Sequence, residues 1–314
     1  MNRSILVLMG TYNGQKYVIS QIDSILNQKN VDVKLLIRDD GSKDNTVKII
    51  NENYSNDPRI ELIEGKNIGC VNCFNILVKE ASKKQGFDYF AFSDQDDIWD
   101  DTKLISGIEL LESTKKSHAN SPRVYFCNLM IADCNANPIR PLFKTNIGLK
   151  KYNMLVTSKA AGCTIVFNKE MAQVYSEHPA QYPSFHDYWM VLIATFFGDV
   201  YFDKKCHIFY RQHSNNAVGL HCLLNWRQRL KNQLLIYFSN DESHFETIKL
   251  FYNEFKNRFT YIDNKKFKLL LNYKYSVINK FKILCSLEYY PDCPFFKNPL
   301  KYFSFVLKVI LGKL

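Results

Sequence analysis

The sequence of 314 residues contains no apolar run long enough to cross a membrane, and it has little glycine or proline. A membrane-spanning helix needs about 20 consecutive apolar residues, and the longest apolar run, residues 189–198, reaches about half that length. With 12 Gly and 9 Pro, the chain is neither collagen-like nor of low complexity. The apolar stretch at residues 5–9 is too short for a secretory signal and precedes no small-residue cleavage site, so we interpret it as a strand.

Disulfide and common cofactor motifs are also missing. The nine cysteines are an odd number scattered through mostly apolar stretches, which favours reduced thiols in a cytoplasmic protein. Cys70 and Cys73 have CxxC spacing, but no second CxxC completes a zinc site, and we interpret them as small residues at a helix start. The chain lacks GxxxxGK[ST] and has no GxGxxG after its first strand, which disfavours a P-loop NTPase and a dinucleotide-dependent oxidoreductase.

The composition is that of a folded protein, but its charge is unevenly distributed. Hydrophobic residues make up 46% of the chain and charged residues 23%, which is too apolar for disorder. The net charge is +10, and residues 216–314 carry 16 Lys and Arg against 7 Asp and Glu, whereas the first 215 residues are nearly balanced. A polar segment at residues 211–216 marks the change. We therefore expect an N-terminal domain at residues 1–215 and a basic C-terminal region at residues 216–314.

Apolar runs and helix-spaced apolar residues alternate through the beginning of the chain. We expect strands at residues 5–9, 33–37, 60–63 and 89–92. We expect helices at residues 18–26, 42–54 and 74–81, the second capped by Ser42 with Asp44 in its first turn. This alternation predicts an α/β fold with a mainly parallel sheet and flanking helices.

Polar clusters follow each of the four expected strands, at residues 11–13, 39–42, 67–69 and 94–97. Ligands of such sheets bind beyond the carboxyl ends of the strands. One such cluster is commonly just a solvated turn, but four clusters at the same edge favour a binding site. Tyr12 could stack on a base, and Asp39 or Asp40 could accept a hydrogen bond from a base N–H or a ribose hydroxyl.

The carboxylates of Asp94, Asp96 and Asp97 are hard oxygen ligands, which suit Mg²⁺ or Mn²⁺ that also holds phosphates. An EF-hand is excluded because the loop starting at Asp94 has no glycine at its sixth position. The alternative is an acidic helix N-terminus, where negative charge favours the helix dipole. Together with the aromatic residue and the other acids, the pattern favours a nucleoside diphosphate held by a divalent cation.

Four of these segments, in this order and spacing, resemble the motif series of family 2 glycosyltransferases. They are TYNG at residues 11–14, DDGS at 39–42, NIG at 67–69 and SDQDDIW at 93–99, so the likeness covers about residues 1–110. Two later segments, HDYW at 186–189 and YRQHSNN at 210–216, resemble bacterial polysaccharide glycosyltransferases, notably the rhamnosyltransferase-like subgroup. The resemblance implies the GT-A fold and inverting, metal-dependent transfer from a nucleotide sugar.

The resemblance also implies roles for individual residues. Asp96 would bind the cation, Mn²⁺ or Mg²⁺, and His213 would complete the metal or diphosphate site. Asp187 would be the catalytic base, although its usual acidic partner is replaced by His186, and the structural alternative for Asp187 is a helix N-cap. The residues implied in nucleotide-sugar binding are Thr11, Tyr12, Asn13, Asp39, Asp40, Asn67 and Asp94.

The expected function is therefore transfer of a sugar from a nucleotide diphosphate donor to a glycan acceptor, which we expect to be lipid-linked, in bacterial O-antigen or capsule synthesis. The rhamnosyltransferase-like motifs favour dTDP-rhamnose as donor, with a UDP-hexose or UDP-N-acetylhexosamine second. A sugar nucleotidyltransferase is one alternative, although residues 10–16 are a weak candidate for the phosphate-gripping loop it needs. A non-catalytic scaffold in a membrane assembly is the other.

The basic C-terminal region has the apolar spacing of helices around residues 223–236, 245–255, 267–278 and 302–314. Basic amphipathic helices with aromatic residues are typical of contact with an anionic membrane surface. The alternative is a helical subdomain or a homodimer surface. Nucleic acid is not an expected partner, because no RNA- or DNA-binding motif accompanies the charge. We therefore expect a cytoplasmic protein, peripheral on the inner face of the bacterial cell membrane.

Overall fold

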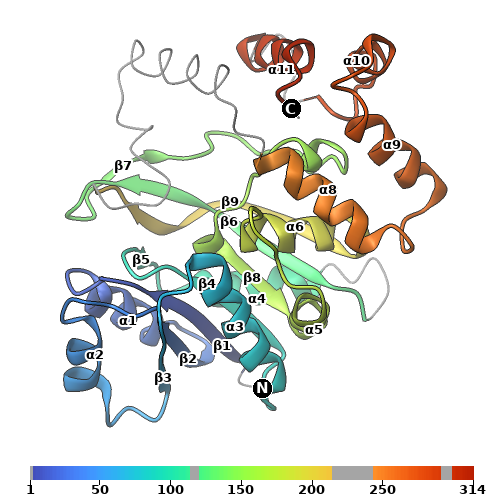
Figure 1. Ribbon diagram of the computed structural model, residues 1–314. Coiled ribbons are helices and arrows are strands. Elements are labelled where there is room, and N and C mark those ends of the chain that lie inside the picture. Colours follow the sequence, from blue (N-terminus) through green and yellow to red (C-terminus); the bar gives the residue numbers. More distant parts are fainter. Residues whose placement is uncertain (1–2, 114–119, 214–242, 291–298) are drawn as a thin grey trace. The chain divides into compact units, whose positions relative to one another are not determined.

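The computed structural model describes residues 3–113, 120–213, 243–290 and 299–314, and the chain divides into two compact units (Figure 1). The first unit consists of Met1–Asn146, Ala160–Ala180 and His186–Gly219. The second unit consists of Ile147–Lys159, Gln181–Phe185 and Leu220–Leu314.

The first unit is built on one sheet, in which the described residues form nine strands in the order β3-β2-β1-β4-β8-β6-β9-β5, with β7 beside β6. The strands are β1 (Arg3–Thr11), β2 (Val31–Asp39), β3 (Ile60–Glu64), β4 (Tyr89–Ser93), β5 (Ile98–Trp99), β6 (Arg123–Ala132), β7 (Pro138–Pro141), β8 (Ile165–Asn168) and β9 (Asp199–Arg211). All four strands expected at the beginning of the chain are present. They pair in parallel, so the prediction is confirmed for this half of the sheet.

The other half of the sheet is mixed. Strand β8 runs antiparallel to both β4 and β6, whereas β6 and β9 are parallel. Two register shifts interrupt the β6–β9 pairing, between Cys127 and Asn128 and between Asn128 and Met130. The two-residue strand β5 pairs antiparallel with β9, placing Ile98 opposite Phe209 and Trp99 opposite Ile208. These pairings join residues between about 40 and 110 positions apart in the chain, which is why local patterns do not predict them.

The helices of the first unit are α1 (Val18–Leu26), α2 (Thr46–Tyr54), α3 (Cys70–Lys83), α4 (Lys103–Ser113), α5 (Lys169–Glu177) and α6 (His186–Phe197). Helix α1 buries Val18, Ile22 and Ile25, as its apolar spacing predicts. Helices α3, α5 and α6 pack against one another, and Figure 1 shows α3 and α5 on the same side of the sheet. The central strand β1 is buried from Ile5 through Met9, as expected for a parallel strand covered on both faces.

The start of α2 differs from expectation. The helix begins at Thr46, four residues after the predicted cap. Ser42 instead donates a hydrogen bond to Asp39 and accepts one from the Asn13 N–H at 2.8 Å. Asp44 precedes the helix and accepts from the Thr46 N–H at 3.0 Å. The capping prediction was wrong because the loop after β2 uses Ser42 to hold the buried Asp39.

The second unit is helical in its described residues. It contains α8 (Ser243–Phe255), α9 (Tyr261–Leu271), α10 (Val277–Leu284), α11 (Pro299–Leu311) and the short helix η1 (Asn153–Leu155). Its core is aromatic, formed around Phe251, Phe255 and Phe267. The buried Tyr152 hydroxyl donates to Asp263 at 2.9 Å. The expected helices near residues 245–255 and 302–314 are confirmed, while that expected at 223–236 lies outside the described residues.

None of the helices in the described ranges combines the length and the apolar character needed to span a lipid bilayer.

Candidate active site

The carboxyl ends of β1 and β2 are joined by Asp39. Its Oδ1 accepts from the Thr11 hydroxyl at 3.0 Å, and its Oδ2 accepts from the N–H groups of Gly41 and Ser42 at 3.0 and 2.8 Å. Asp39 is buried. Its carboxylate therefore orders the loop after β2, and very little of it is exposed to a ligand.

Asp40, the neighbouring acid, joins the end of β2 to the loop before α3. It pairs with buried Arg38 at 2.5 Å and accepts from the N–H groups of Ile68 and Gly69 at 3.0 and 2.9 Å. Gly41 is needed in this loop, because its φ is +79° and a Cβ there would lie 2.9 Å from the Asn67 nitrogen. The structure thus brings Asp39, Asp40 and the exposed Asn67 to one edge, with both carboxylates hydrogen-bonded to the chain.

Tyr12 lies beside the acidic segment because Gln95 pairs with its backbone. The Gln95 side chain accepts from the Tyr12 N–H and donates to the Tyr12 carbonyl, both at 2.9 Å. Gly14 makes room for this contact, since a Cβ there would lie 2.1 Å from Gln95 Oε1. Asn13 turns the chain, with a φ of 51°, and accepts from the Lys43 N–H at 2.8 Å. Tyr12 is 42% exposed, so part of this residue is accessible to a ligand.

Asp96 and His213, which are 117 residues apart in the sequence, meet in the folded chain. His213 Nε2 lies 2.8 Å from Asp96 Oδ2. The Tyr17 ring stacks on the imidazole with ring centroids 5.0 Å apart, and the Arg211 guanidinium lies 4.9 Å from the centre of the Tyr17 ring. The two residues expected to hold a cation are therefore neighbours, oriented by an aromatic ring.

Asp94 and Asp97 lie behind this pair, close to Cys163. Ligand atoms of these three residues are all within 4.8 Å of one another. Asp97 is fully buried; its Oδ1 accepts from the Arg211 N–H at 3.2 Å, and its Oδ2 has no hydrogen-bond partner. Among the described residues, His213 is the only basic side chain within ion-pair distance of the acidic segment.

The acidic segment holds more negative than positive charge, although the buried Lys103 offsets part of the charge on Asp94 and Asp97. Burial, together with the negative charges of Asp96 and Asp187, raises the pKa of Asp94 to about 7. Burial and the charges of Asp96 and Asp94 raise the pKa of Asp97 well above its usual range. Like charges confined in a poorly solvated place oppose ionisation, and a bound divalent cation would relieve that opposition. The oxygen-rich donor set and the orphaned Asp97 Oδ2 fit Mg²⁺ or Mn²⁺.

Asp187 is the second residue of α6, and it lies close enough to Asp94 for its charge to raise the pKa of Asp94. Its Oδ1 accepts from the Tyr188 N–H at 2.6 Å, and the side chain is half-buried. The preceding residue, His186, is buried against Phe74, with ring centroids 3.9 Å apart, and edge-on to Phe92 at 5.0 Å. Burial lowers the pKa of His186, so its ring is neutral. A carboxylate at that position would be buried between aromatic rings, which gives a physical reason for histidine there.

Comparison with protein-family models matches residues 6–171 to glycosyl transferase family 2. The chain belongs to this family. It is a glycosyltransferase, and this membership decides against a sugar nucleotidyltransferase and against a non-catalytic scaffold.

Among relatives of this family 2 glycosyltransferase is the dTDP-rhamnosyl transferase RfbG of Shigella flexneri. It is 31% identical over 226 residues, which cover 67% of this chain and 73% of the relative. The chondroitin synthase of Escherichia coli is 37% identical over 94 residues, covering 30% of this chain and 13% of the relative. The likeness to RfbG thus covers more than twice as much of this chain as the likeness to the chondroitin synthase.

Solved structures confirm the GT-A fold expected for the family 2 glycosyltransferase. Residues 1–349 of S. aureus TarS, in complex with UDP-GlcNAc, give a TM-score of 0.54 at 12% identity, covering 100% of this chain and 90% of that one. The mannosyltransferase PcManGT of Pyrobaculum calidifontis, in complex with GDP-Man and Mn²⁺, gives 0.51 at 12% identity, covering 100% and 86%.

Several residues near the candidate site were not predicted from the sequence of this glycosyltransferase to take part in it. Tyr17 is in contact with His213, Gln95 pairs with Tyr12, and Cys163 lies beside Asp94 and Asp97. Gln95 alone lies inside a recognised motif. The others reach the site through the packing of α1 and the turn before β8, which only the folded chain reveals.

Cys70 and Cys73 lie at the start of α3, as expected. Burial raises the pKa of Cys70 to about 12 and that of Cys73 to about 11. Both thiols are therefore protonated at neutral pH, which gives them little nucleophilic or metal-binding character. Cys73 is buried and packs in the core, whereas Cys70 is exposed.

Proposed function

We propose that this glycosyltransferase moves a sugar from a nucleoside diphosphate donor to a hydroxyl group of a glycan acceptor, with inversion at the anomeric carbon, in bacterial O-antigen or capsule synthesis. The observation that carries the proposal is the 2.8 Å contact between Asp96 and His213 beside Asp94 and Asp97, which have no basic side chain within ion-pair distance among the described residues. A nucleotide-sugar donor brings a divalent cation with its diphosphate, and that cation would supply positive charge next to these aspartates. dTDP-rhamnose is the first candidate donor, supported by the relative named a dTDP-rhamnosyl transferase.

The donor would lie along the edge formed by Thr11, Tyr12, Asn13, Asp39, Asp40, Asn67 and Asp94. Partly exposed Tyr12 suits stacking on the base. The buried carboxylates of Asp39 and Asp40 are held in place by the chain, so they can accept from a base N–H or ribose hydroxyl with little loss of side-chain freedom. A UDP-hexose or UDP-N-acetylhexosamine is the second candidate, because uracil and thymine share these hydrogen-bonding edges.

Asp96 and His213 would hold the divalent cation, Mg²⁺ or Mn²⁺, with Asp94 near both cation and ribose. When bound there, the cation neutralises charge on the leaving nucleoside diphosphate. Tyr17 keeps the imidazole of His213 in place by stacking. The side-chain carboxylates would be ionised once the cation is present, since its charge lowers their raised pKa values.

Asp187 would act as the base. Its Oδ1 is engaged by the Tyr188 N–H, which leaves Oδ2 to take the proton of the acceptor hydroxyl. As that proton moves to Asp187 Oδ2, the acceptor oxygen forms its bond to the anomeric carbon. The bond between that carbon and the diphosphate oxygen breaks, and its electron pair leaves with the nucleoside diphosphate. Neutral, buried His186 does not exchange protons in this scheme.

Isothermal calorimetry with UDP, dTDP, GDP and CDP, each with Mn²⁺ and with EDTA, tests the donor and the cation together. We expect one nucleotide to bind in Mn²⁺ and to bind much more weakly in EDTA; dTDP would support rhamnose, and UDP a hexose or N-acetylhexosamine. Asp96→Asn should remove the effect of Mn²⁺. Glu52→Gln, which removes an exposed acid on α2, is the matched control. Absence of binding by all four nucleotides would refute the proposal.

We propose that the second unit attaches the enzyme to an anionic bilayer on the cytoplasmic face of the cell membrane, where a lipid-linked acceptor would be presented. Val277, Ile278 and Phe281 on α10, and Phe303 and Ile310 on α11, are between 52% and 83% exposed. On each helix these residues lie opposite the buried positions, and the two helices pack together. The excess of Lys and Arg in residues 216–314 complements anionic headgroups.

Sedimentation with vesicles tests this attachment. The wild type should bind vesicles containing phosphatidylglycerol and leave neutral phosphatidylcholine vesicles unbound. The double variant Ile278→Glu and Phe281→Glu should lose most of that binding, because it places charge in the apolar face. Ile262→Glu, at an exposed apolar position of α9, is the control that should keep it. Equal binding by both variants would contradict a bilayer as the occupant of this face.

A further inference from the structure

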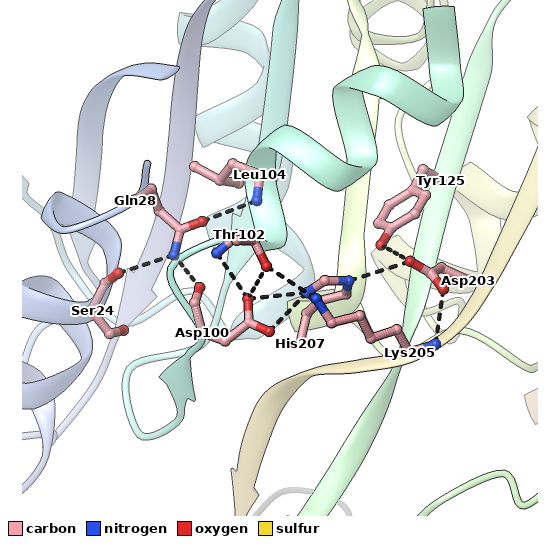
Figure 2. A network of polar contacts seen from close by, with 9 residues as sticks. All are labelled: Ser24, Gln28, Asp100, Thr102, Leu104, Tyr125, Asp203, Lys205 and His207. Atoms are coloured by element: carbon pink, nitrogen blue, oxygen red, sulfur yellow. Dashed lines mark hydrogen bonds and ion pairs between the residues drawn. The ribbon is translucent and has the colours of Figure 1, made fainter. Parts of the chain in front are cut away.

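A fully buried histidine, His207 on β9, lies between two carboxylates from different parts of the first unit (Figure 2). Its Nδ1 lies 3.0 and 2.9 Å from the two carboxylate oxygens of Asp100, and its Nε2 lies 3.3 Å from Asp203 Oδ2. Both ring nitrogens therefore face anionic acceptors. A neutral imidazole has one N–H and can donate to only one of them, whereas an imidazolium donates to both.

Each carboxylate is itself held by further groups, as Figure 2 shows. Asp203 accepts from the Tyr125 hydroxyl at 3.2 Å and from the Lys205 N–H at 2.8 Å. Asp100 accepts from the Thr102 N–H at 2.9 Å. These hydrogen bonds orient the two carboxylates independently of the histidine. The side chains of Asp100, Asp203 and His207 together form one bridge from β9 to the chain segment after β5.

This bridge lies beside the β5–β9 pairing. The two chain segments that continue from this pairing carry Asp96 and His213, the expected cation ligands. Asp100 follows the acidic segment by three residues, and its N–H also donates to the His207 carbonyl at 2.9 Å. The β5–β9 pairing starts there, with Trp99 opposite Ile208. From this point one strand leads back to Asp96, while the other leads forward through Arg211 to His213.

The bridge is also tied to the helices that flank the acidic segment. The Gln28 side chain donates to the Asp100 carbonyl, donates to the Ser24 carbonyl at 3.2 Å and accepts from the Leu104 N–H at 3.0 Å (Figure 2). Gln28 thus joins the end of α1, the start of α4 and the backbone of Asp100. Asp100 directly follows β5, and β5 directly follows the acidic segment, so a shift of Asp100 would be transmitted to that segment.

We propose that His207 is a positioning residue for the cation site: as an imidazolium bridging Asp100 and Asp203, it holds β5 on β9 and thereby keeps Asp96 within reach of His213. The proposal rests on the proposed function in one respect, namely that Asp96 and His213 bind the cation. His207 touches neither of them and acts only through the two strands.

The charge on His207 follows from the groups around it. Burial lowers its pKa, but the hydrogen bonds to Asp100 and Asp203 outweigh burial and raise the pKa above the usual histidine value. The titratable groups on the surrounding elements are Asp100, Lys103, Tyr125, Cys127, Asp203 and Lys205. Burial keeps Tyr125 and Cys127 protonated by raising their pKa values, so the two aspartates are the only anions of this group at neutral pH.

Binding of Mn²⁺ in the presence of dTDP or UDP, followed by the loss of the free Mn²⁺ paramagnetic resonance signal, tests the proposal. His207→Gln keeps a hydrogen-bonding side chain but cannot carry a charge. At pH 6.5 we expect it to weaken Mn²⁺ binding about 10- to 100-fold, as loss of a group that orients metal ligands does. His244→Gln is the control, because His244 lies in the second unit, where its Nε2 is 3.0 Å from the carbonyl of Leu155.

A pH series separates positioning by charge from simple packing. The ratio of the wild-type affinity to that of His207→Gln should fall towards one as the pH rises above the ordinary histidine range, because the wild type then loses its imidazolium. Titration of the cation ligands is common to both proteins and cancels in the ratio. Asp203→Asn, which removes one anion of the bridge but keeps its oxygen, should show a weaker form of the same trend and serves if His207→Gln fails to fold.

The outcomes are distinct. Equal Mn²⁺ affinity of the wild type and His207→Gln, or a ratio that stays constant with pH, would overturn the positioning role while leaving the proposed function intact. A wild type that binds no Mn²⁺ with any nucleotide would overturn the proposed function and this inference together.

Discussion

The first unit contains two groups of carboxylates, Asp94 with Asp97 and Asp100 with Asp203. The two groups differ in the positive charge that lies near them. Asp100 and Asp203 enclose His207, with contacts of 2.9 and 3.3 Å. Asp94 and Asp97, by contrast, have no basic side chain within ion-pair distance among the residues that the structure describes. Despite burial, hydrogen bonds to His207 lower the pKa values of Asp100 and Asp203, whereas burial and like charge raise those of Asp94 and Asp97.

We interpret the difference as one between acids that stabilise the fold and acids that are available to a ligand. A buried charge is costly unless it is paired. The chain supplies the cation for the first group, so that group is complete by itself. For the second group it supplies the buried Lys103, which offsets part of the negative charge, and His213 contacts only the neighbouring Asp96. Among the described residues the Asp97 Oδ2 atom has no hydrogen-bond partner. These differences support the proposal that the second group takes a cation from solution.

The largest effect that would test this comparison concerns Asp96. Asp96→Asn keeps the size of the side chain but removes a charge that the chain does not need for folding. Because a bound metal contributes several kcal/mol to the reaction, we expect kcat/KM for sugar transfer to fall about 1,000-fold, with little change in melting temperature. Transfer assays with the donor identified by calorimetry measure this, with Glu52→Gln as control. Activity above a tenth of the wild type would place the cation elsewhere.

The paired group should behave in the opposite way, with its main effect on stability. His207→Gln leaves two carboxylates facing each other without a counter-charge, and we expect the free energy of unfolding to fall by about 3 kcal/mol. Urea unfolding monitored by circular dichroism measures it. His244→Gln provides the comparison, and equal losses in the two variants would show that the charge of His207 contributes nothing.

A smaller effect of opposite sign is expected at Asp97. Asp97→Asn can keep the hydrogen bond from the Arg211 N–H through its Oδ1, but it removes a buried charge next to Asp94. The cation-free protein should therefore be stabilised by about 1 kcal/mol, which corresponds to about 2–4 °C in melting temperature for a unit of this size. The same variant should bind Mn²⁺ more weakly. A lower melting temperature in EDTA would mean that Asp97 is already neutralised within the chain.

The pH dependence of stability gives the smallest but most discriminating test. Asp94 and His207 both have raised pKa values in the folded chain, so the folded state binds more protons than the unfolded one and stability falls as pH rises. For Asp94 the loss extends from the ordinary aspartate range to about pH 7. For His207 the stabilisation is complete below the ordinary histidine pKa and is lost as pH rises through the raised value.

A bound cation should remove only the first of these losses. Melting curves at pH 5 to 9 with Mg²⁺ and with EDTA, for the wild type and for His207→Gln, distinguish them. Mg²⁺ should restore stability at pH 7 to 7.5 in both proteins, and the alkaline loss should be absent from the variant. A single loss that Mg²⁺ abolishes throughout would mean that the two groups of acids are not independent.

The sequence predicts the parallel half of the sheet correctly because each of its signals is local. The buried run at residues 5–9, the helical spacing of Val18, Ile22 and Ile25, and the polar ends of the strands all lie within one element or its neighbour. Ser42 shows the limit of such reasoning. It is a good cap by residue type, but the buried carboxylate of Asp39 uses it instead, and that demand is invisible in the sequence around it.

The sequence by itself determined the family, the α/β plan and the edge of the sheet where the site lies, since motif order and hydrophobic period are properties of neighbouring residues. Only the tertiary structure decided that Asp96 meets His213, that Asp39 and Asp40 are held by the chain, and that His207 lies between Asp100 and Asp203. Each of these depends on pairing between distant strands and on burial. Contacts between residues 100 or more positions apart, and the solvation they remove, exist only once the chain is folded.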